Sequence, residues 1–450
     1  MRENDVIRFG AGPKNTSPSG TGVTVRSRQL AFGGDAVGEV TESPSNSELL
    51  GITAFVPFVV PGETVRVRVT EEKKRYLRGD LLDVLTPSED RTEPTCKVFG
   101  SCGGCELQHI RYERQLELKR EMIRGSLAAA RLGMDVLDAV QPIIPSAPYN
   151  YRRRVSLHVD SRGTVGFYRA NTRSVVMTDR CPISVDAIND VFPGAREFGA
   201  EVGGRITSIQ LEADQNGVIA VLKTPSDLQT REREGILQKA RKHFDSAVLM
   251  SGNREVGGFG RQILELPLNE SRTLLFTIPA GYFSQVNWEV NLELVRYVAE
   301  QSAVVHGQDV LDLYSGAGNF SLPLAKLGGK VVGVEVDTRL VALGRQMVSK
   351  YRLERQLTFV EGSVEAFLKS DKRQKRYDVI VADPPRSGLG GASELLPDSE
   401  RFVLISCHLP SLVRDLKQLQ ELGYEATSIQ PFDMFAQTSY TEVVAVFRRG

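Results

Sequence analysis

Cys407 lies between an apolar run, Phe402–Ile405, and a stretch of helical periodicity that begins at Pro410. Proline suits the first turn of a helix, because an N–H there would have no intrahelical partner. We therefore expect Cys407 in a turn between the carboxyl end of a strand and the start of a helix, where open α/β sheets bind ligands. A helix N-terminus favours a thiolate, so this position predicts a nucleophile. The alternative is a buried cysteine that packs as a small apolar residue.

A second motif predicts a nucleoside site. Residues 311–320 read as a strand that runs into a Gly-x-Gly turn, Gly316 to Gly318, and then into a helix. The glycines let the backbone approach a ligand closely. Glu335 ends the next expected strand, where a carboxylate can accept hydrogen bonds from both ribose hydroxyls. Position 321 is a serine and not the third glycine of a dinucleotide site, so the motif favours S-adenosylmethionine over NAD.

Two further segments supply candidate site residues. Asp383-Pro-Pro-Arg386 follows an expected strand, and its prolines form a rigid lip beside the cofactor. Methyltransferases that act on amino groups usually place an aromatic residue after the prolines, so Arg386 indicates another target atom. Glu442 opens an otherwise apolar strand, Val443–Phe447, and is a candidate base. The alternative for Glu442 is an ordinary surface carboxylate.

Four cysteines have the spacing of metal ligands. Cys96, Cys102 and Cys105 are separated by five and two residues, and Cys181 follows after seventy-five more. Four thiolates can hold a structural zinc ion or an iron–sulfur cluster. Zinc ribbons usually pair two Cys-x-x-Cys knuckles, so one compact group with a distant fourth ligand favours iron–sulfur. Four unrelated buried cysteines are the alternative.

The overall composition adds limits. A length of 450 residues predicts about three domains, and the net charge of zero predicts no partner for the chain as a whole. The N-terminus lacks the apolar core of a signal peptide, and no apolar run approaches the ~20 residues that span a bilayer. We expect a cytoplasmic monomer with no membrane contact. Five cysteines in such a chain do not predict a disulfide framework.

The first half of the chain divides into a tail, a barrel and a basic central domain. Residues 1–21 predict a flexible tail, and residues 22–86 contain five short strand-like segments, which suggest a small barrel of the OB type. The ribbon 66–79 has a net charge of +4 around Tyr76, a pattern that fits phosphates and a stacked base. A solvated charged hairpin is the alternative.

Residues 87–275 form the expected central domain. It begins with the cysteine group and an amphipathic helix, 110–132. The strand-like segment 149–179 and Arg180 together carry seven arginines against two aspartates, with tyrosines and a phenylalanine interleaved. Arginine binds phosphates bidentately and stacks on bases, so this segment predicts an RNA-facing sheet. Residues 182–275 continue an α/β pattern without a motif that indicates chemistry.

Residues 276–450 predict an open α/β domain. A helix is expected over 285–304, and strands then alternate with helices until two closely spaced final strands, 425–430 and 442–448. Too few residues separate these two strands for a crossover helix, so they should be antiparallel. A parallel sheet that ends in an antiparallel strand is the pattern of class I, Rossmann-like methyltransferases.

Together these motifs resemble the bacterial RNA uridine carbon-5 methyltransferases, in particular the iron–sulfur members with an N-terminal TRAM domain that modify 23S ribosomal RNA. The resemblance covers residues 22–450. It rests on Ala31-Phe-Gly-Gly-Asp35, Pro61-Gly-Glu63, Cys102-Gly-Gly-Cys-Glu-Leu-Gln-His109, Gly166-Phe-Tyr-Arg169, Cys181-Pro-Ile183, Phe283-Ser-Gln-Val-Asn287, residues 312–320, Asp383-Pro-Pro-Arg386, Ser406-Cys407 and Glu442.

The resemblance implies a role for each candidate residue. Cys407 would be the nucleophile, adding to carbon 6 of the uracil, and Glu442 would be the base. A 4Fe–4S cluster and S-adenosylmethionine are the implied cofactors. The cluster ligands would be Cys96, Cys102, Cys105 and Cys181, and the S-adenosylmethionine contacts would be Gln285, Tyr314, Glu335 and Asp383, beside the glycine turn.

The chain departs from the family pattern at two places. The family usually has Asn-Pro after the cysteine, where this chain has His408-Leu409-Pro410, and Gln437 and Tyr440 stand where histidines are common. These departures leave room for a non-catalytic RNA-binding or ribosome-assembly factor. The same chemistry on transfer RNA and the methylation of cytosine carbon 5 are two more functions that this pattern allows.

Overall fold

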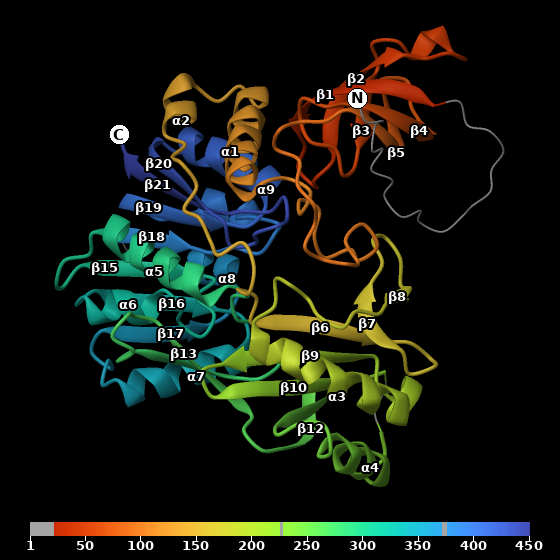
Figure 1. Ribbon diagram of the computed structural model, residues 1–450. Coiled ribbons are helices and arrows are strands. Elements are labelled where there is room, and N and C mark those ends of the chain that lie inside the picture. The colour runs from red at the N-terminus through yellow and green to blue at the C-terminus, as the bar shows by residue number, and fades with distance from the viewer. Residues whose placement is uncertain (1–21, 226–227, 371–375) are drawn as a thin grey trace. The chain divides into compact units, whose positions relative to one another are not determined.

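The computed structural model describes residues 22–225, 228–370 and 376–450 (Figure 1). The expected tail, residues 1–21, lies outside the described residues. The chain forms two compact units. The first runs to Met122 and includes two later segments, Phe167–Thr178 and Ala436–Tyr440, and the second contains the remaining residues. No helix in the described part of the chain is long and apolar enough to cross a membrane.

The first unit begins with the predicted barrel, which is confirmed. Its strands close in the order β1-β2-β3-β5-β4, and valine, leucine and alanine side chains on alternate positions fill the interior. Alternation of this kind follows from the two-residue period of a strand. The strands are β1 (Val23–Leu30), β2 (Ala36–Glu42), β3 (Thr53–Val56), β4 (Thr64–Glu72) and β5 (Tyr76–Thr86).

A helix follows the cysteine loop. This helix, α1 (Tyr112–Ala129), is two to three residues shorter at each end than the predicted 110–132. Ile110 instead ends a turn, in which its N–H donates to Leu107 O at 2.9 Å. Leu107, Ile110 and Leu118 pack together in a small buried cluster. Ile110, which was expected to start the helix, is therefore a core residue of the turn that precedes it.

The second unit contains a sheet built from the central part of the chain. Strand β9 lies between β6 and β10, and β10 pairs in parallel with β11, which pairs with β12. The predicted strand segment 149–179 is broken into β6, β7 and β8. The elements of this central part, of which β8 belongs to the first unit, are α2 (Met134–Asp138), β6 (Arg154–Val159), β7 (Val165–Tyr168), β8 (Val175–Val176), α3 (Asp186–Val202), β9 (Ser208–Asp214), β10 (Gly217–Thr224), α4 (Thr230–Ala240), β11 (Ala247–Ser251) and β12 (Arg254–Phe259).

The predicted open sheet of the C-terminal part is confirmed and has seven strands in the order β17-β16-β15-β18-β19-β21-β20 (Figure 1). The first five strands are parallel, and β21 is antiparallel to both β19 and β20. The strands are β15 (Asp309–Leu313), β16 (Lys330–Glu335), β17 (Leu357–Glu361), β18 (Tyr377–Ala382), β19 (Ser399–Ser406), β20 (Tyr424–Phe432) and β21 (Glu442–Arg449).

Helices and one hairpin accompany this sheet. The first helix starts at Trp288 and not at the expected residue 285, because Asn287 caps it by accepting a hydrogen bond from Val290 N. The elements are β13 (Ile263–Pro267), β14 (Leu275–Pro279), α5 (Trp288–Ser302), α6 (Ser321–Lys326), α7 (Thr338–Lys350), α8 (Val364–Lys369) and α9 (Leu409–Glu421).

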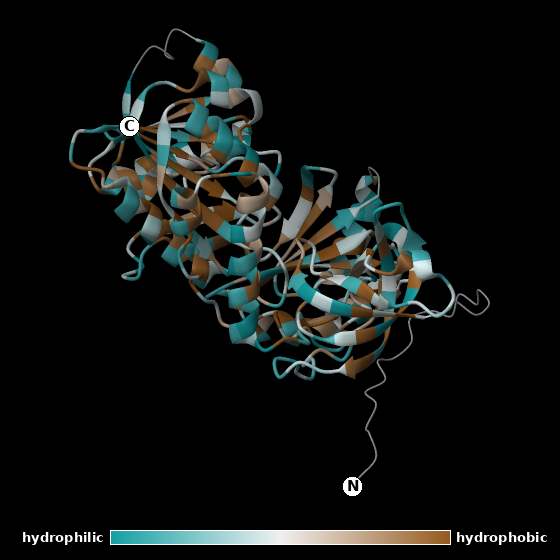
Figure 2. Ribbon diagram, turned by 90° about the horizontal axis from the view of Figure 1, so that it is seen from above, coloured by the Kyte–Doolittle hydropathy of each residue, from teal (hydrophilic) through white to brown (hydrophobic). Residues whose placement is uncertain are grey.

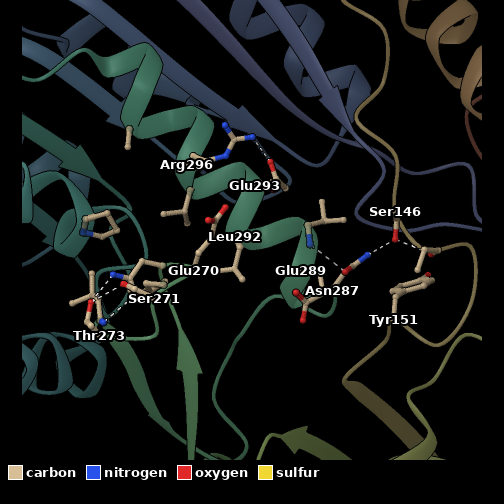
Figure 3. Close-up of a pocket in the computed structure, with 18 of the residues that line it drawn as sticks. Ser146, Tyr151, Glu270, Ser271, Thr273, Asn287, Glu289, Leu292, Glu293 and Arg296 are labelled. Atoms are coloured by element: carbon tan, nitrogen blue, oxygen red, sulfur yellow. Dashed lines mark hydrogen bonds and ion pairs between the residues drawn. The ribbon is translucent and has the colours of Figure 1, made fainter.

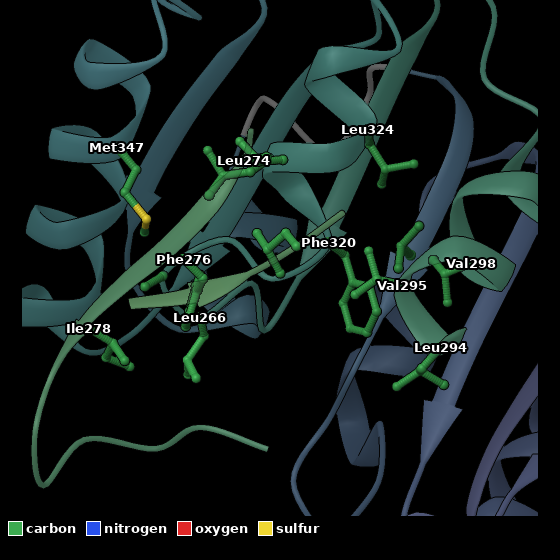
Figure 4. Close-up of a cluster of buried hydrophobic side chains, with 14 of the residues drawn as sticks. Leu266, Leu274, Phe276, Ile278, Leu294, Val295, Val298, Phe320, Leu324 and Met347 are labelled. Carbon is green, nitrogen blue, oxygen red and sulfur yellow. The ribbon is translucent and has the colours of Figure 1, made fainter. Parts of the chain in front are cut away.

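One hydrophobic core supports the C-terminal sheet and the hairpin. Side chains from the hairpin, α5, α6 and α7 gather in a single buried cluster (Figure 4). In Figure 2, which is coloured by hydropathy, hydrophobic residues are concentrated on the strands and hydrophilic residues on the outer turns of the helices. The strands are therefore held by buried packing, and their carboxyl ends are left to carry polar side chains.

Candidate active site

The glycine turn after β15 has the conformation that a close ligand approach requires. Tyr314, Gly316 and Gly318 all have positive φ values, of 62°, 55° and 106°. A Cβ atom at Gly318 would lie 3.0 Å from Phe359 Cζ, so this position has no space for a side chain. Tyr314 has to adopt a left-handed backbone that costs a non-glycine residue free energy, which is typical of functional turns.

Glu335 lies at the carboxyl ends of the parallel strands, beside the glycine turn. Because β15 and β16 are parallel and pair Leu313 with Val334, Glu335, the last residue of β16, lies directly beside the turn. Its carboxylate accepts hydrogen bonds from Gly316 N at 3.0 Å and from Asp337 N at 2.8 Å. These bonds orient the carboxylate, and each oxygen keeps a lone pair that could accept a ribose hydroxyl.

Asp312 is a buried carboxyl that the sequence analysis did not single out as a separate site residue. It lies within β15 and accepts a hydrogen bond from Ser321 Oγ, while its Oδ1 atom has no hydrogen-bond partner. Burial raises the pKa of Asp312 to about 7, and the neighbouring Asp383 and Glu335 raise it further against the effect of Ser321. Only its place two residues before the turn could have indicated it.

Cys407 occupies the predicted turn between β19 and α9. Its side chain is half-buried, and His408 is the N-cap residue of the helix. Burial raises the pKa of the Cys407 thiol to about 11, which favours the thiol over the predicted thiolate in the free protein. Glu442 and Asp383 raise this pKa as well, and only Arg386 lowers it. The effect of the helix N-terminus is therefore smaller than the effect of desolvation and two carboxylates.

Glu442 and Cys407 come together through the strand register. Strands β19 and β21 are antiparallel and pair Ser406 with Val443, so the next residue on each strand, Cys407 and Glu442, lies one step beyond that pair. Glu442 is buried, with a relative exposure of 2%. Burial raises the pKa of Glu442 well above its usual value, and Asp383 adds to this rise. Glu442 is therefore not an ordinary surface carboxylate.

The segment Asp383-Pro-Pro-Arg386 contributes two more side chains to the candidate active site, Asp383 and Arg386. Strands β18 and β19 are parallel and pair Ala382 with Leu404, which brings Asp383 to the same edge of the sheet. Burial raises the pKa of Asp383 to about 7. Arg386 is exposed and hydrogen-bonds to the Cys407 thiol. The sequence analysis used Arg386 only to exclude an amino-group target and did not recognise it as a partner of the cysteine.

The remaining predicted residues are placed as follows. Gln285 lies half-buried in the segment between β14 and α5. His408 Nδ1 lies 3.1 Å from Ser411 Oγ, so this departure from the family pattern engages the first turn of α9. Gln437 and Tyr440 belong to the first compact unit, whereas the residues of the carboxyl edge belong to the second.

The cysteines of the expected metal site form no disulfide bond and are half-buried. Cys96, Cys102 and Cys105 lie on one loop of the first unit, where Cys96 N donates to Gln108 Oε1 at 3.0 Å. Cys181 lies in the second unit. Over the described ranges, no group of three or more His, Cys, Asp or Glu side chains is arranged to hold a metal ion. The four-thiol site stays a prediction.

The basic ribbon of the barrel is confirmed as a hairpin of β4 and β5, but much of its charge is already paired. Arg66 contacts Asp83, Arg68 contacts Asp80, Lys73 contacts Glu71 and Arg78 contacts Asp35. These ion pairs are largely exposed, and such pairs contribute little, so a phosphate can compete for the same side chains. The role of the ribbon in binding RNA stays a prediction.

A pocket of about 990 Å³ lies beside α5, away from the predicted catalytic and cofactor-binding residues (Figure 3). The turn of the β13–β14 hairpin, α6 and the loop around Ser146 also line it. Asn287 Nδ2 donates to Ser146 Oγ at 2.7 Å across one end. None of the predicted catalytic or cofactor-binding residues lines this pocket, so it is separate from the carboxyl edge of the sheet.

The sheet order and the polar group at its carboxyl edge are those of a class I methyltransferase that uses S-adenosylmethionine. A model of the family described as tRNA (Uracil-5-)-methyltransferase matches residues 259–449, and a TRAM domain model matches residues 21–82. The chain is 33% identical over 411 residues to the 23S rRNA (uracil(1939)-C(5))-methyltransferase RlmD of Shewanella woodyi, covering 88% of this chain and 91% of that protein. The chain belongs to the RNA uracil carbon-5 methyltransferase family.

Two more proteins show the same similarity. The Shewanella amazonensis protein with the same printed name is 32% identical over 410 residues, covering 89% of this chain and 92% of that protein. The solved structure of the Pyrococcus abyssi tRNA (uracil-54, C5)-methyltransferase in complex with S-adenosyl-L-homocysteine has a TM-score of 0.71 at 23% identity. It covers 94% of this chain and 99% of that chain, which confirms the fold.

Proposed function

We propose that this protein methylates carbon 5 of a uridine in 23S ribosomal RNA, with S-adenosylmethionine as the methyl donor. The family assignment supports the reaction, and the relatives named 23S rRNA methyltransferases support the substrate. The single structural observation behind the proposal is the register that aligns Cys407 with Glu442 at the carboxyl edge of the sheet. A nucleophile and a base on one side of a site are what this chemistry needs.

The chemistry explains why a cysteine is required. Carbon 5 of uracil is too weakly nucleophilic to accept a methyl group directly. Addition of the Cys407 sulfur to carbon 6 converts the ring to an enolate, which places electron density on carbon 5. S-adenosylmethionine supplies the methyl group to that carbon. Glu442 then removes the carbon-5 proton, so that the ring regains its double bond and the Cys407 thiolate leaves.

The raised pKa values indicate a second role for the carboxylates, which is to accept the proton of the Cys407 thiol. Cys407 is a thiol at neutral pH, so its proton has to leave before or during the attack. Asp383 and Glu442 both influence the thiol electrostatically, and a carboxylate with a pKa near 7 can accept a proton at working pH. Arg386 stabilises the sulfur once it is negative.

The cofactor would lie against the glycine turn. Glu335 would accept the ribose hydroxyls, and the open backbone at Gly316 and Gly318 would allow close approach. Tyr314, Gln285 and Asp383 complete the proposed contacts. The residues present fit this group, because Glu335 is already oriented by two backbone N–H groups and the space beside Gly316 is open, where even an added Cβ atom would meet nothing within 4 Å.

The target base has to leave its stack, since carbon 6 must be approached from the face of the ring. We therefore expect the substrate to be a loop or a locally opened helix, which is the usual target of sequence-specific RNA recognition. The matched family model and the Pyrococcus structure carry the name of a tRNA methyltransferase, so tRNA is the second candidate substrate. Methylation of protein-free 23S rRNA and of tRNA from labelled cofactor, with the modified uridine mapped, decides between them.

A covalent trap tests the mechanism. Fluorine at carbon 5 cannot be removed as a proton, so RNA that contains 5-fluorouridine should remain bonded to the wild-type enzyme through denaturing electrophoresis. Cys407→Ala should form no adduct, while Glu421→Gln, an exposed change at the end of α9, should form as much as the wild type. An adduct that persists in Cys407→Ala would remove this residue from the mechanism.

We also propose that Cys96, Cys102, Cys105 and Cys181 ligate a 4Fe–4S cluster that orders the arginine-rich segment. The spacing and the conformation of the loop support this assignment; Gly100, for example, has a φ of +77°. The test is anaerobic purification followed by the absorbance near ~400 nm and an iron, sulfide and zinc analysis. Stoichiometric zinc without iron would refute the cluster, and Cys102→Ser should lose iron while Cys407→Ser keeps it.

A further inference from the structure

The turn that carries Arg386 lies beyond the reach of strand pairing. Strand β18 ends at Ala382, and its pairing with β19 ends at the same residue. Arg386 follows in a β-turn that is closed by a hydrogen bond from Gly388 N to Pro385 O at 2.7 Å. Its side chain is exposed and hydrogen-bonds to the Cys407 thiol. Another contact therefore has to hold this turn beside the sulfur.

A buried carboxylate on α9 holds the far side of the turn. Asp415 is completely buried, with a relative exposure of 0%, and its Oδ2 accepts a hydrogen bond from Leu389 N at 3.0 Å. Its neighbour Arg414 donates from Nη2 to Asp415 Oδ1 at 2.9 Å, and the same nitrogen donates to Ser387 O. Two successive side chains of the helix thus bind the backbone on both sides of Gly388.

Gly388 allows the turn to come this close to the helix. Its φ is +74°, a conformation that favours glycine. A Cβ atom at this position would overlap both Asp415 Oδ2 and Arg414 Nη2, so any side chain would separate the turn from α9. The attachment of the turn to the helix therefore depends on a glycine and on a buried acid, which lie 27 residues apart in the sequence.

The helix that holds the turn also starts beside the nucleophile. Helix α9 begins at Leu409, after Cys407 and the N-cap residue His408. It packs against β19 and β20, and Asp415 lies on its second turn. Cys407 and the attachment point of the Arg386 turn therefore belong to one continuous element. All of these residues belong to the second unit.

We propose that Asp415 is a positioning residue for Arg386, and that by holding the Arg386 turn on α9 it keeps the guanidinium beside the Cys407 sulfur. The inference rests on the proposed function, because that function assigns Cys407 the attack on carbon 6. The charged groups that face the sulfur are Arg386, Asp383 and Glu442. Without the anchor the turn can move away, and the sulfur then keeps its two anionic neighbours and loses its cation.

The sign of the effect separates positioning from a direct effect of charge. Asp415→Ala removes a negative charge, which by itself can only lower the pKa of a nearby thiol or leave it unchanged. Release of Arg386 acts in the opposite direction and raises the pKa of Cys407. Asp415→Asn keeps an oxygen that can accept from Leu389 N, so it should restore most of the wild-type behaviour. Gly388→Ala should also raise the pKa, because it displaces the turn without removing a charge.

The assay is the pH profile of iodoacetamide labelling of the Cys407 peptide in the free enzyme, which needs neither RNA nor S-adenosylmethionine. For Asp415→Ala we expect the profile to move to higher pH by about 0.7 unit, which corresponds to about fivefold less thiolate below the midpoint. Lys417→Ala, an exposed change on the same helix, is the matched control. Thermal melting of each variant shows whether the fold is kept.

A double variant tests whether Asp415 acts through Arg386. In an Arg386→Gln background, Asp415→Ala should cause no further shift of the profile, because the group that it positions is already absent. A general loosening of the site would instead shift both backgrounds equally. Adduct formation with 5-fluorouridine RNA should also be slower in Asp415→Ala than in Lys417→Ala, since less thiolate is present.

Three results would overturn the inference. The first is a profile of folded Asp415→Ala that coincides with the wild type or lies at lower pH. The second is an equal shift in the Arg386→Gln background, and the third is a folded Asp415→Asn that behaves like Asp415→Ala. Absence of a 5-fluorouridine adduct in the wild type would refute the proposed function, while the labelling profiles would still decide whether Asp415 positions Arg386.

Discussion

The pKa of Cys407 gives the sharpest test of the site geometry. We expect Glu442→Gln to lower this pKa, because the variant removes the carboxylate that raises it most after burial. With a pKa of about 11, only about one thiol in a thousand is ionised at pH 8. Residues opposite each other on adjacent strands have Cβ atoms ~5 Å apart, and a unit charge at that distance contributes about 3 kcal/mol at an effective dielectric constant of ~20.

Solvent reduces this effect, because Cys407 is only half-buried. We therefore expect a decrease of about one pKa unit, which corresponds to ~1.4 kcal/mol and to roughly tenfold faster thiolate chemistry near pH 9. The assay is the rate of iodoacetamide labelling of the Cys407 peptide between about pH 7 and pH 11, followed by mass spectrometry. Arg386→Gln should shift the profile in the opposite direction, and Glu421→Gln should leave it unchanged. Equal profiles for the wild type and Glu442→Gln would refute the alignment of the two residues.

Three further predictions concern other parts of the chain. Gly318→Ala should reduce stability by about 1–3 kcal/mol in denaturant titrations and weaken binding of S-adenosylhomocysteine, because its Cβ would lie 3.0 Å from Phe359; unchanged calorimetric affinity would contradict this. The folded pKa of Asp312, about 7, lies above the ~3.9 of an unfolded aspartate, so stability should fall as the pH rises from about 4 to 7. Asp312→Asn should lack this fall, and parallel melting curves against pH would argue against a raised pKa. Replacing Lys74 and Arg75, both exposed on the barrel ribbon, with alanine should lower the salt dependence of RNA binding by about 0.7 per residue in a log–log plot; an unchanged slope would exclude the ribbon from the interface.

Local patterns were sufficient for the elements of the C-terminal sheet. Strand-length apolar runs and the short spacing before Glu442 predicted the parallel strands and the antiparallel end, since both depend on residues close in sequence. The turn at Gly316 could be predicted for the same reason, because glycine spacing reports local backbone conformation.

Contacts between residues that are far apart in the sequence could not be predicted from local patterns. The alignment of Cys407 with Glu442 depends on the register of two strands, and the hydrogen bond from Arg386 depends on a loop about twenty residues earlier in the chain. The raised pKa of the Cys407 thiol could not be predicted either, because a helix start can be read from sequence whereas the desolvation of a side chain cannot. The hydrogen bond from Gln115 to Gln437, which are 322 residues apart, has no local signal.

The position of β21 in the sheet also has a consequence for how the protein is made. Strand β21 lies between β19 and β20, both of which leave the ribosome before it. Until it inserts, those two strands expose unpaired edges, and such edges are prone to join other chains. These edges therefore stay open to other chains until β21 is in place, and the same event brings in Glu442, the proposed base, so catalytic competence should begin only when β21 has joined the sheet.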